Sequence, residues 1–250
     1  MTAPIMPGAE PWSAQGGPNG VVVLHGFTGN CGSMRGLATA FHDAGHAVEM
    51  PLLPGHGTSV EDMIPTSWID WSGAAEEAYE KLAGRCERVA VAGLSMGGTL
   101  TVWLAGRHPE TAAAVCVNPL VEAPEGMEDA VRQMMADGEE TIAGIGSDIA
   151  DPDQVESAYP MTPVAPMLSM FDAAKELTGL LPKIICPVLI LTSPQDHVVP
   201  PENSDVLAAA VSGPVERITL ERSYHVATQD YDKDLVERSA VDFVDRAFKG

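Results

Sequence analysis

Residues 88–105 read RVAVAGLSMGGTLTVWLA. The first five residues form an apolar run that predicts a buried strand, and the last eight predict a helix. The pentapeptide between them fits the pattern G-x-S-x-G and has Ser95 at its centre. A strand, a sharp turn and a helix are the setting in which such a serine is exposed as a nucleophile. The start of the helix would then direct N–H groups and the positive end of its dipole toward the reacting centre.

The pentapeptide alone is a weak signal, because it also fits a Gly-rich turn with an inert serine. A serine hydroxyl becomes a good nucleophile only when a base takes its proton, so the chain must also supply a histidine and an acid. In the fold class that uses this turn, both follow the serine along the chain, and the acid comes first.

Asp196 and His225 satisfy that order. A β-rich apolar run at residues 187–192 ends shortly before Asp196, and residues 215–220, which predict a short edge strand, end shortly before His225. Open α/β sheets place their sites at the carboxyl ends of the strands, so Ser95 and these two side chains are expected at one edge of one sheet. We predict a catalytic triad in which Ser95 is the nucleophile, His225 the base and Asp196 the acid that orients it.

Both assignments have rivals. Among the seven histidines, His197 adjoins Asp196 but precedes the last strand, so the chain order favours His225. Glu202 and Asp205 are alternative acids, but a simpler interpretation is that they begin a helix, where acidic residues are favoured.

Residues 20–29, GVVVLHGFTG, predict a strand that runs into a His-Gly loop. Such a loop supplies one N–H group of an oxyanion hole, and the residue after the nucleophile supplies the other. This indicates the backbone N–H groups of Phe27 and Met96 as the donors. The alternative is an ordinary turn at the end of a strand.

The alternation of short β-rich runs with longer helical stretches predicts an α/β fold with a mostly parallel sheet covered by helices. The pattern changes at residues 119–181, which are rich in Met, Pro and Gly and follow the apolar strand 114–117. We expect this stretch, called the cap segment below, to lie above the nucleophile, with residues 1–118 and 182–250 as the core. Met-rich surfaces adapt to varied apolar ligands. The alternative interpretation of this stretch is a loosely structured helical insertion in which the Met side chains only fill space.

Taken together, the chain resembles the bacterial monoacylglycerol lipase and carboxylesterase group of the α/β-hydrolase superfamily. The resemblance runs essentially from end to end and implies an α/β-hydrolase fold with a small cap. Its matching blocks are HGFTG (25–29), PGHGT (54–58), GLSMGGT (93–99), DHVVPP (196–201) and SYHVAT (223–228).

The resemblance also assigns two cap residues. Ile145 and Glu156 match family positions that line the pocket, and the family's Glu binds the glycerol hydroxyls. From the residues alone, Glu156 fits a solvated surface charge equally well. The acidic stretch 122–140 departs most from the family pattern, which leaves the shape of the cap and the acyl-chain preference open.

The formal net charge of −21 disfavours nucleic acid, which needs a basic footprint, and sustained docking on anionic membranes. We expect a small-molecule ester or monoacylglycerol as the partner, with lipid contact limited to transient encounters through the cap. The sequence carries no nucleotide-binding fingerprint and no C-x-x-C pair, so neither a cofactor nor a metal is expected. The absence of a signal-like N-terminus and four scattered cysteines favour the cytoplasm.

The expected function is hydrolysis of carboxylic esters through an acyl-enzyme, with a monoacylglycerol as the favoured substrate. A carboxylesterase of broad specificity, a thioesterase or a lactonase would use the same triad. Haloalkane dehalogenases and epoxide hydrolases share the fold but have an aspartate nucleophile, so Ser95 counts against them. A binding module without activity would be expected to lack a triad member, and all three candidates are present.

Overall fold

The computed structural model describes residues 3–144 and 146–250. The strands are β1 (Trp12–Ala14), β2 (Asn19–Leu24), β3 (Ala47–Met50), β4 (Arg88–Leu94), β5 (Ala114–Val117), β6 (Thr141–Ala143), β7 (Met161–Pro163), β8 (Val188–Thr192) and β9 (Val215–Thr219). The helices are α1 (Arg35–Asp43), α2 (Val60–Met63), α3 (Trp68–Ala83), α4 (Met96–Arg107), α5 (Met127–Ala136), α6 (Val164–Leu177), α7 (Glu202–Ala210) and α8 (Lys233–Lys249), with short 3-10 turns at η1 (Cys31–Met34) and η2 (Leu181–Lys183).

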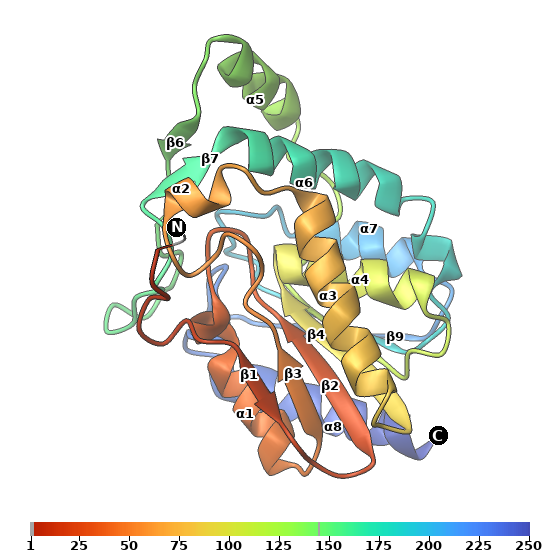
Figure 1. Ribbon diagram of the computed structural model, residues 1–250. Coiled ribbons are helices and arrows are strands. Elements are labelled where there is room, and N and C mark those ends of the chain that lie inside the picture. Colours follow the sequence, from red (N-terminus) through yellow and green to blue (C-terminus); the bar gives the residue numbers. More distant parts are fainter. Residues whose placement is uncertain (1–2, 145) are drawn as a thin grey trace.

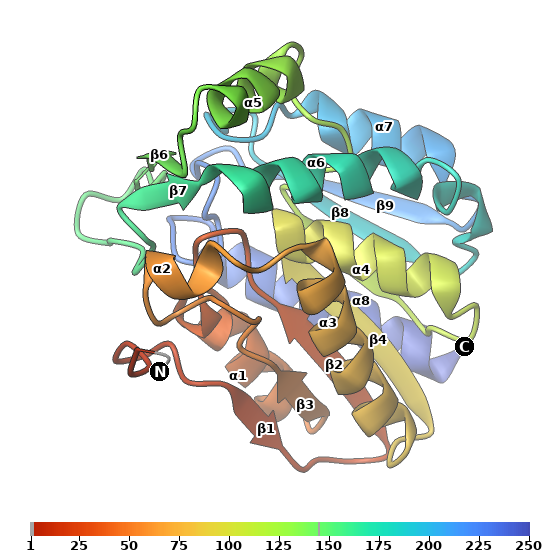
Figure 2. The same cartoon turned by 45° about the horizontal axis from the view of Figure 1, so that its top comes forward.

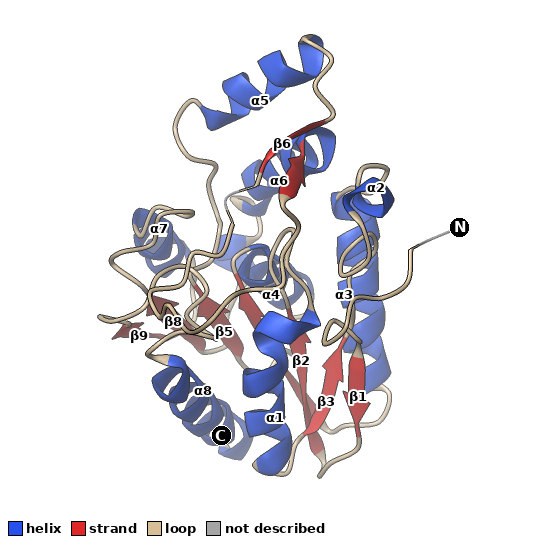
Figure 3. Ribbon diagram, turned by 90° about the vertical axis from the view of Figure 1, so that its left-hand side faces the viewer, coloured by secondary structure: helices blue, strands red, loops and turns tan. Residues whose placement is uncertain are grey.

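The central sheet has the order β1-β3-β2-β4-β5-β8-β9, and every neighbouring pair is parallel except β1 with β3. The predicted α/β fold with a mostly parallel sheet is therefore confirmed. Parallel sheets need both faces covered, and here α1 and α8 lie side by side on one face while α3 and α4 cover the other (Figure 3).

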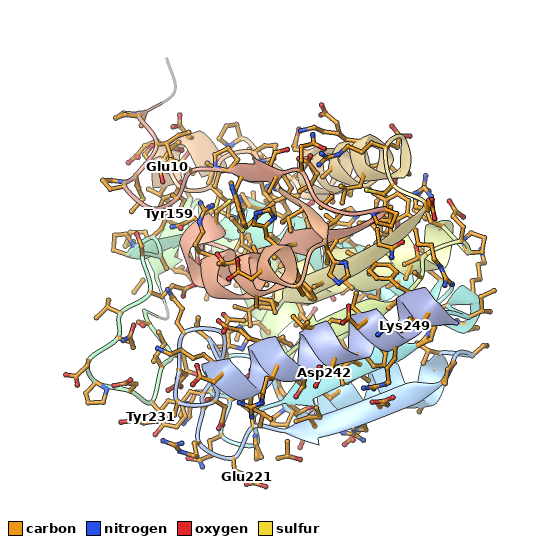
Figure 4. All side chains as sticks on the ribbon, turned by 90° about the horizontal axis from the view of Figure 1, so that it is seen from below. Glu10, Tyr159, Glu221, Tyr231, Asp242 and Lys249 are labelled. Carbon is orange, nitrogen blue, oxygen red and sulfur yellow. The ribbon has the colours of Figure 1, made fainter. Side chains whose placement is uncertain are left out.

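Alternation along β2 explains this layering. Val21 and Val23 pack into the apolar cluster that contains Phe41 of α1 and Phe243 of α8, whereas Val22 and Leu24 join the cluster on the α3 and α4 side. Successive side chains of a strand point to opposite faces, so a fully apolar strand serves both layers. Seen from below, α8 runs along the sheet, with Asp242 and Lys249 on its exposed side (Figure 4).

The strand register places the carboxyl ends of the central strands at one edge of the sheet. Leu24 pairs with Gly93, and Val117 pairs with both Leu94 and Leu191. The loops after β2, β4, β5, β8 and β9 consequently meet above this edge. These loops carry the residues that the sequence singled out.

The cap segment contains α5, the antiparallel pair β6–β7 and α6. α6 buries Met167, Met170 and Phe171 in the same apolar cluster as α3 and α4, so it forms a layer over the core. α5 packs on α6 and stands farther from the sheet (Figures 1 and 2). No helix among the described residues is both long enough and apolar enough to cross a lipid bilayer.

Candidate active site

Ser95 occupies the turn between β4 and α4 in a strained conformation, with φ 57° and ψ −119°. A positive φ is uncommon for residues other than glycine and is typical of functional turns. The neighbouring glycines make this turn possible. A Cβ added to Gly93 would lie 2.1 Å from the carbonyl oxygen of Gly97, and one added to Gly97 would lie 2.1 Å from that of Leu24. The turn thus requires both glycines of the motif.

His225 and Asp196 form a close, buried pair. The Nδ1 atom of His225 lies 2.7 Å from Oδ2 of Asp196, and the two side chains are 8% and 2% exposed. The other carboxylate oxygen of Asp196 accepts hydrogen bonds from the N–H groups of Val198 and Val199, each at 2.8 Å. With Nδ1 donating to the carboxylate, Nε2 of a neutral imidazole is left as a proton acceptor.

The predicted triad residues converge on one pocket. Ser95 and His225 both line it, together with Phe27 of the loop after β2, while Asp196 lies behind His225. This pocket brings together side chains from the loops after β2, β4, β5, β8 and β9 and from the cap segment. Glu202 and Asp205, the alternative acids, lie in the first turn of α7 instead.

The loop after β2 presents Phe27 beside the nucleophile. Among the hydrogen bonds of the described loops and helix starts, none is donated by the N–H of Phe27 or of Met96, the first residue of α4. His25 holds this loop: its Nδ1 donates to the carbonyl oxygen of Gly26 at 3.0 Å, and its Nε2 accepts from the N–H of Leu53 at 3.1 Å. Burial lowers the pKa of His25 to about 4, so the ring stays neutral and can make both bonds. No pattern in the sequence indicates this role of the His25 side chain.

The pocket has an apolar side built mainly by the cap segment. α6 contributes Met167, Met170 and Phe171, and α5 contributes Met127. The cap segment also adds Leu120, which follows β5, and the core adds the pair Val198 and Val199 after β8. An apolar wall of this kind suits an acyl chain, and the Met side chains can adapt to its length.

Glu156 and Thr28 line the same pocket and give it a polar side. Burial raises the pKa of Glu156 to about 7, although the nearby His225 counteracts the rise. Among the described residues, the carboxylate of Glu156 has no hydrogen-bond donor, whereas its backbone N–H donates to Oγ of Ser147 at 2.9 Å. A carboxylate in this position can accept hydrogen bonds from ligand hydroxyls. Ile145, the other cap residue that the resemblance assigned, lies outside the described residues.

The chain next to Glu156 is attached to the core. The hydroxyl of Tyr159 accepts from the N–H of Thr58 and donates to the carbonyl oxygen of Gly55, each at 2.8 Å. The N–H of Tyr159 donates to the carbonyl oxygen of Thr28 at 3.1 Å. These bonds fix the polar side of the pocket to the loop that carries Phe27.

The part of the chain that the structure describes contains no cluster of three or more His, Cys, Asp or Glu side chains arranged to hold a metal ion. The pocket instead brings together the Ser95 hydroxyl and the His225 imidazole, and Asp196 is hydrogen-bonded to that imidazole. Such a Ser–His–Asp arrangement on a sheet of this topology defines the serine hydrolases of the α/β-hydrolase class.

Comparison with known proteins gives the family. Residues 18–232 match the Hydrolase_4 family, described as serine aminopeptidase, S33, and the chain belongs to this family of the α/β-hydrolase superfamily.

Curated relatives cover almost the whole chain. It is 43% identical over 244 residues to a thermostable monoacylglycerol lipase from Bacillus sp. (strain H-257), covering 96% of each protein. It is 26% identical over 243 residues to a carboxylesterase from Bacillus subtilis (strain 168), covering 95% of this chain and 96% of that one. The resemblance to monoacylglycerol lipases and carboxylesterases predicted from the sequence is thus confirmed.

A solved structure supports the same conclusion. The fold matches a structure reported for LipS and LipT, two metagenome-derived lipolytic enzymes, with a TM-score of 0.94 and 39% identity. The match covers 97% of this chain and all of that one.

Proposed function

We propose that the protein is a monoacylglycerol lipase, which converts a glycerol monoester and water into a fatty acid and glycerol. The observation that carries the proposal is the pocket that Ser95 and His225 line together with apolar side chains of the cap segment and with Glu156. A monoacylglycerol combines an acyl chain with free hydroxyls, and each part finds a complementary surface. The 43% identity to a curated monoacylglycerol lipase supports this assignment.

The proposed reaction begins when Oγ of Ser95 attacks the ester carbonyl carbon and its proton passes to Nε2 of His225. The carboxylate of Asp196, 2.7 Å from Nδ1, stabilises the imidazolium that forms. The N–H groups of Phe27 and Met96 donate to the oxyanion, where charge develops. His225 then protonates the leaving alcohol, which departs as glycerol and leaves an acyl-enzyme.

In the second half, His225 takes a proton from a water molecule, which attacks the acyl carbon. The tetrahedral intermediate collapses, Ser95 recovers its proton from the imidazolium, and the fatty acid leaves. In this scheme the acyl chain lies along Met167, Met170 and Phe171, and the glycerol hydroxyls face Thr28 and Glu156. The carboxylic acid product then carries a negative charge, and the formal net charge of −21 on the protein favours its release.

A carboxylesterase of broader specificity is the second candidate. The polar side of the pocket consists of few groups, and the relative from Bacillus subtilis bears the name carboxylesterase. A thioester would use the same triad. The two candidates differ in whether the Glu156 carboxylate contributes to substrate binding.

We also propose that the enzyme works on small-molecule esters in the cytoplasm. All four cysteines are free, and burial raises the pKa of the Cys31 and Cys116 thiols, which keeps them in the thiol form. Free thiols persist in a reducing compartment.

The deciding experiment compares monoacylglycerols of increasing acyl length with p-nitrophenyl esters of the same acids, for the wild-type enzyme and Glu156→Ala. Ser95→Ala is the inactive reference, and Ser212→Ala, at an exposed turn, is the matched control. Preference for monoacylglycerols that Glu156→Ala abolishes, with p-nitrophenyl turnover retained, supports the proposal. Good turnover of p-nitrophenyl esters alone, with a silent Glu156→Ala, would identify a general carboxylesterase.

A further inference from the structure

Asp148 of the cap segment contacts both loops that carry the His225–Asp196 pair. Its Oδ2 atom accepts hydrogen bonds from the backbone N–H groups of His197 and His225, each at 3.1 Å. Its Oδ1 atom lies 2.8 Å from Nδ1 of His197. One carboxylate therefore bridges the residue next to Asp196 and the backbone of His225 itself.

The backbone of Asp148 strengthens this bridge. Its carbonyl oxygen accepts a hydrogen bond from the N–H of Val226 at 3.1 Å. The side chain of Asp148 is only 12% exposed and lies at the wall of the active-site pocket. Hydrogen bonds from N–H groups to a carboxylate are stronger than those between neutral groups, and limited solvent access preserves their strength.

The loops after β8 and β9 are also joined from the core side. Asn118 donates through Nδ2 to the carbonyl oxygen of His225 at 2.8 Å and accepts from the N–H of Ser193 at 2.8 Å. Ser193 in turn donates to the carbonyl oxygen of Tyr224 at 2.8 Å. The peptide groups of His225 are thus held from two directions, with Asn118 on its carbonyl and Asp148 on its N–H.

A second carboxylate attaches the same part of the cap segment to the His225 loop. The buried side chain of Asp230 accepts from the N–H groups of Ala150 and Asp151 at 2.7 and 3.0 Å, and from that of Tyr224 at 2.9 Å. Residues 148–151 consequently move only if several charge-assisted hydrogen bonds to the His225 loop break.

We infer that Asp148 is a positioning residue, which holds the loops of His225 and Asp196 in the geometry that proton transfer requires. This inference rests on the proposed function, since it assumes that His225 serves as the base for Ser95. Proton transfer depends on hydrogen-bond reach, and a displacement of about 1 Å can cost on the order of 100-fold in rate. Asp148 acts through the backbone of His225, without contact to the reacting atoms.

The inference separates Asp148 from Glu156, although both line the pocket. A positioning residue affects every substrate that Ser95 attacks, whereas a residue that binds glycerol affects only monoacylglycerols. A loss of positioning lowers kcat and leaves KM nearly unchanged, because the apolar wall that binds the acyl chain is intact.

The test measures kcat and KM of Asp148→Ala on a p-nitrophenyl ester and on a monoacylglycerol of equal acyl length, with the rate of labelling by a fluorophosphonate. We expect kcat and the labelling rate to fall about tenfold or more on both substrates, with KM within about twofold. Asp148→Asn should recover much of the loss, because its amide oxygen can accept the two backbone N–H groups. His197→Ala should have a smaller effect, since it removes only a side chain that is 61% exposed.

Asp151→Asn is the matched control, because within the described part of the chain its carboxylate accepts a hydrogen bond only from the N–H of Asp153 in the same segment. A folded Asp148→Ala enzyme with wild-type kcat and labelling rate would overturn the inference, as would a defect confined to KM for monoacylglycerols. If Asp148→Ala does not fold, Asp148→Ser decides between the same outcomes. Failure of the proposed function would differ, because the wild-type enzyme itself would then hydrolyse p-nitrophenyl esters without preferring monoacylglycerols.

Discussion

Glu156 lies where a side chain on Gly29 would stand. A Cβ added to Gly29 would come within 2.8 Å of Oε1 of Glu156. The carboxylate therefore rests directly over the backbone of the loop that follows β2, a few residues from Phe27. The absence of a side chain at position 29 gives the acidic group its place in the pocket.

Gly29→Ala should displace the Glu156 carboxylate without disturbing the fold, because the atom it meets is the end of a flexible side chain and φ of Gly29 lies outside the left-handed region. We expect KM for a monoacylglycerol to rise several-fold. A hydrogen bond between the substrate and the charged carboxylate contributes about 1.5–3 kcal/mol, and water replaces part of this contribution when the bond is lost. Kinetics on a p-nitrophenyl ester should be unchanged. Gly179→Ala is the control, because a Cβ there meets only ordinary contacts. If Gly29→Ala and Gly179→Ala had equal effects on the monoacylglycerol and on the p-nitrophenyl ester, the position of the Glu156 carboxylate beside Gly29 would be contradicted.

The selectivity for monoacylglycerols should depend on pH through Glu156. Its pKa is raised to about 7 by burial, so the carboxylate becomes fully charged only above that pH and then accepts the stronger hydrogen bonds. The ratio of kcat/KM for a monoacylglycerol to kcat/KM for a p-nitrophenyl ester should therefore increase from pH 6 to pH 8. The ratio cancels effects on the triad, and it should be flat for Glu156→Gln. A flat wild-type ratio would contradict the prediction.

The same raised pKa has a consequence for stability. A carboxyl group whose folded pKa exceeds its ordinary value of 4.5 binds its proton more tightly in the folded state, so deprotonation destabilises the fold as pH rises from about 4.5 to 7. Glu156→Gln has no ionisable group at this position, so its fold does not lose this stability as the pH rises. Its melting temperature should equal that of the wild type near pH 4.5, exceed it increasingly up to pH 7, and keep a constant advantage above pH 7. Calorimetric scans of both proteins across this pH range test the sign of the difference in melting temperature.

Asp196→Asn should lower kcat by about 10³–10⁴-fold while leaving the loop folded. The amide oxygen can still accept from Val198 and Val199, but the amide nitrogen would donate to Nδ1 of His225 and hold the imidazole proton on Nε2. An imidazole in that tautomer cannot accept the proton of Ser95. Steady-state kinetics with a p-nitrophenyl ester, beside thermal melts, would measure the effect; activity near the wild-type level would place the acid elsewhere.

Two glycines should respond to alanine in opposite directions. A Cβ on Gly97 would lie 2.1 Å from the carbonyl oxygen of Leu24 and 2.8 Å from that of His25, and backbone atoms cannot yield. Gly97→Ala should cost about 3 kcal/mol or prevent folding. Gly73 is exposed within α3 and a Cβ there meets nothing, so Gly73→Ala should stabilise by about 0.5–1 kcal/mol. Chemical denaturation of both variants checks the contrast.

Ser95, Asp196 and His225 were accessible to sequence analysis because each follows a strand, and because parallel strands end at one edge. The observed register, with Leu24 beside Gly93 and Val117 beside Leu191, realises that expectation. The roles of these residues in catalysis, like those of Phe27 and Met96, stay predictions that the experiments above address.

Other features of the structure could not be predicted, because the sequence carries no pattern that indicates them. Asp148 meets His225 across 77 positions, and neither residue lies in a periodic segment that would indicate the contact. The strands β1, β6 and β7 have three residues each, too few for alternation to distinguish them from loops. Glu156 fitted a surface charge and a binding group equally well until its place in the pocket wall was known.

The attachment of residues 148–151 to the His225 loop limits how this enzyme can be recombined with its relatives. The cap segment enters after β5 and returns before β8, so a chimaera could exchange it as one contiguous stretch. A donor cap without an acid at the position of Asp148 would leave the N–H groups of His197 and His225 without their acceptor. Specificity and rate would then change together, and a graft intended to broaden the range of esters would need to carry this aspartate with it.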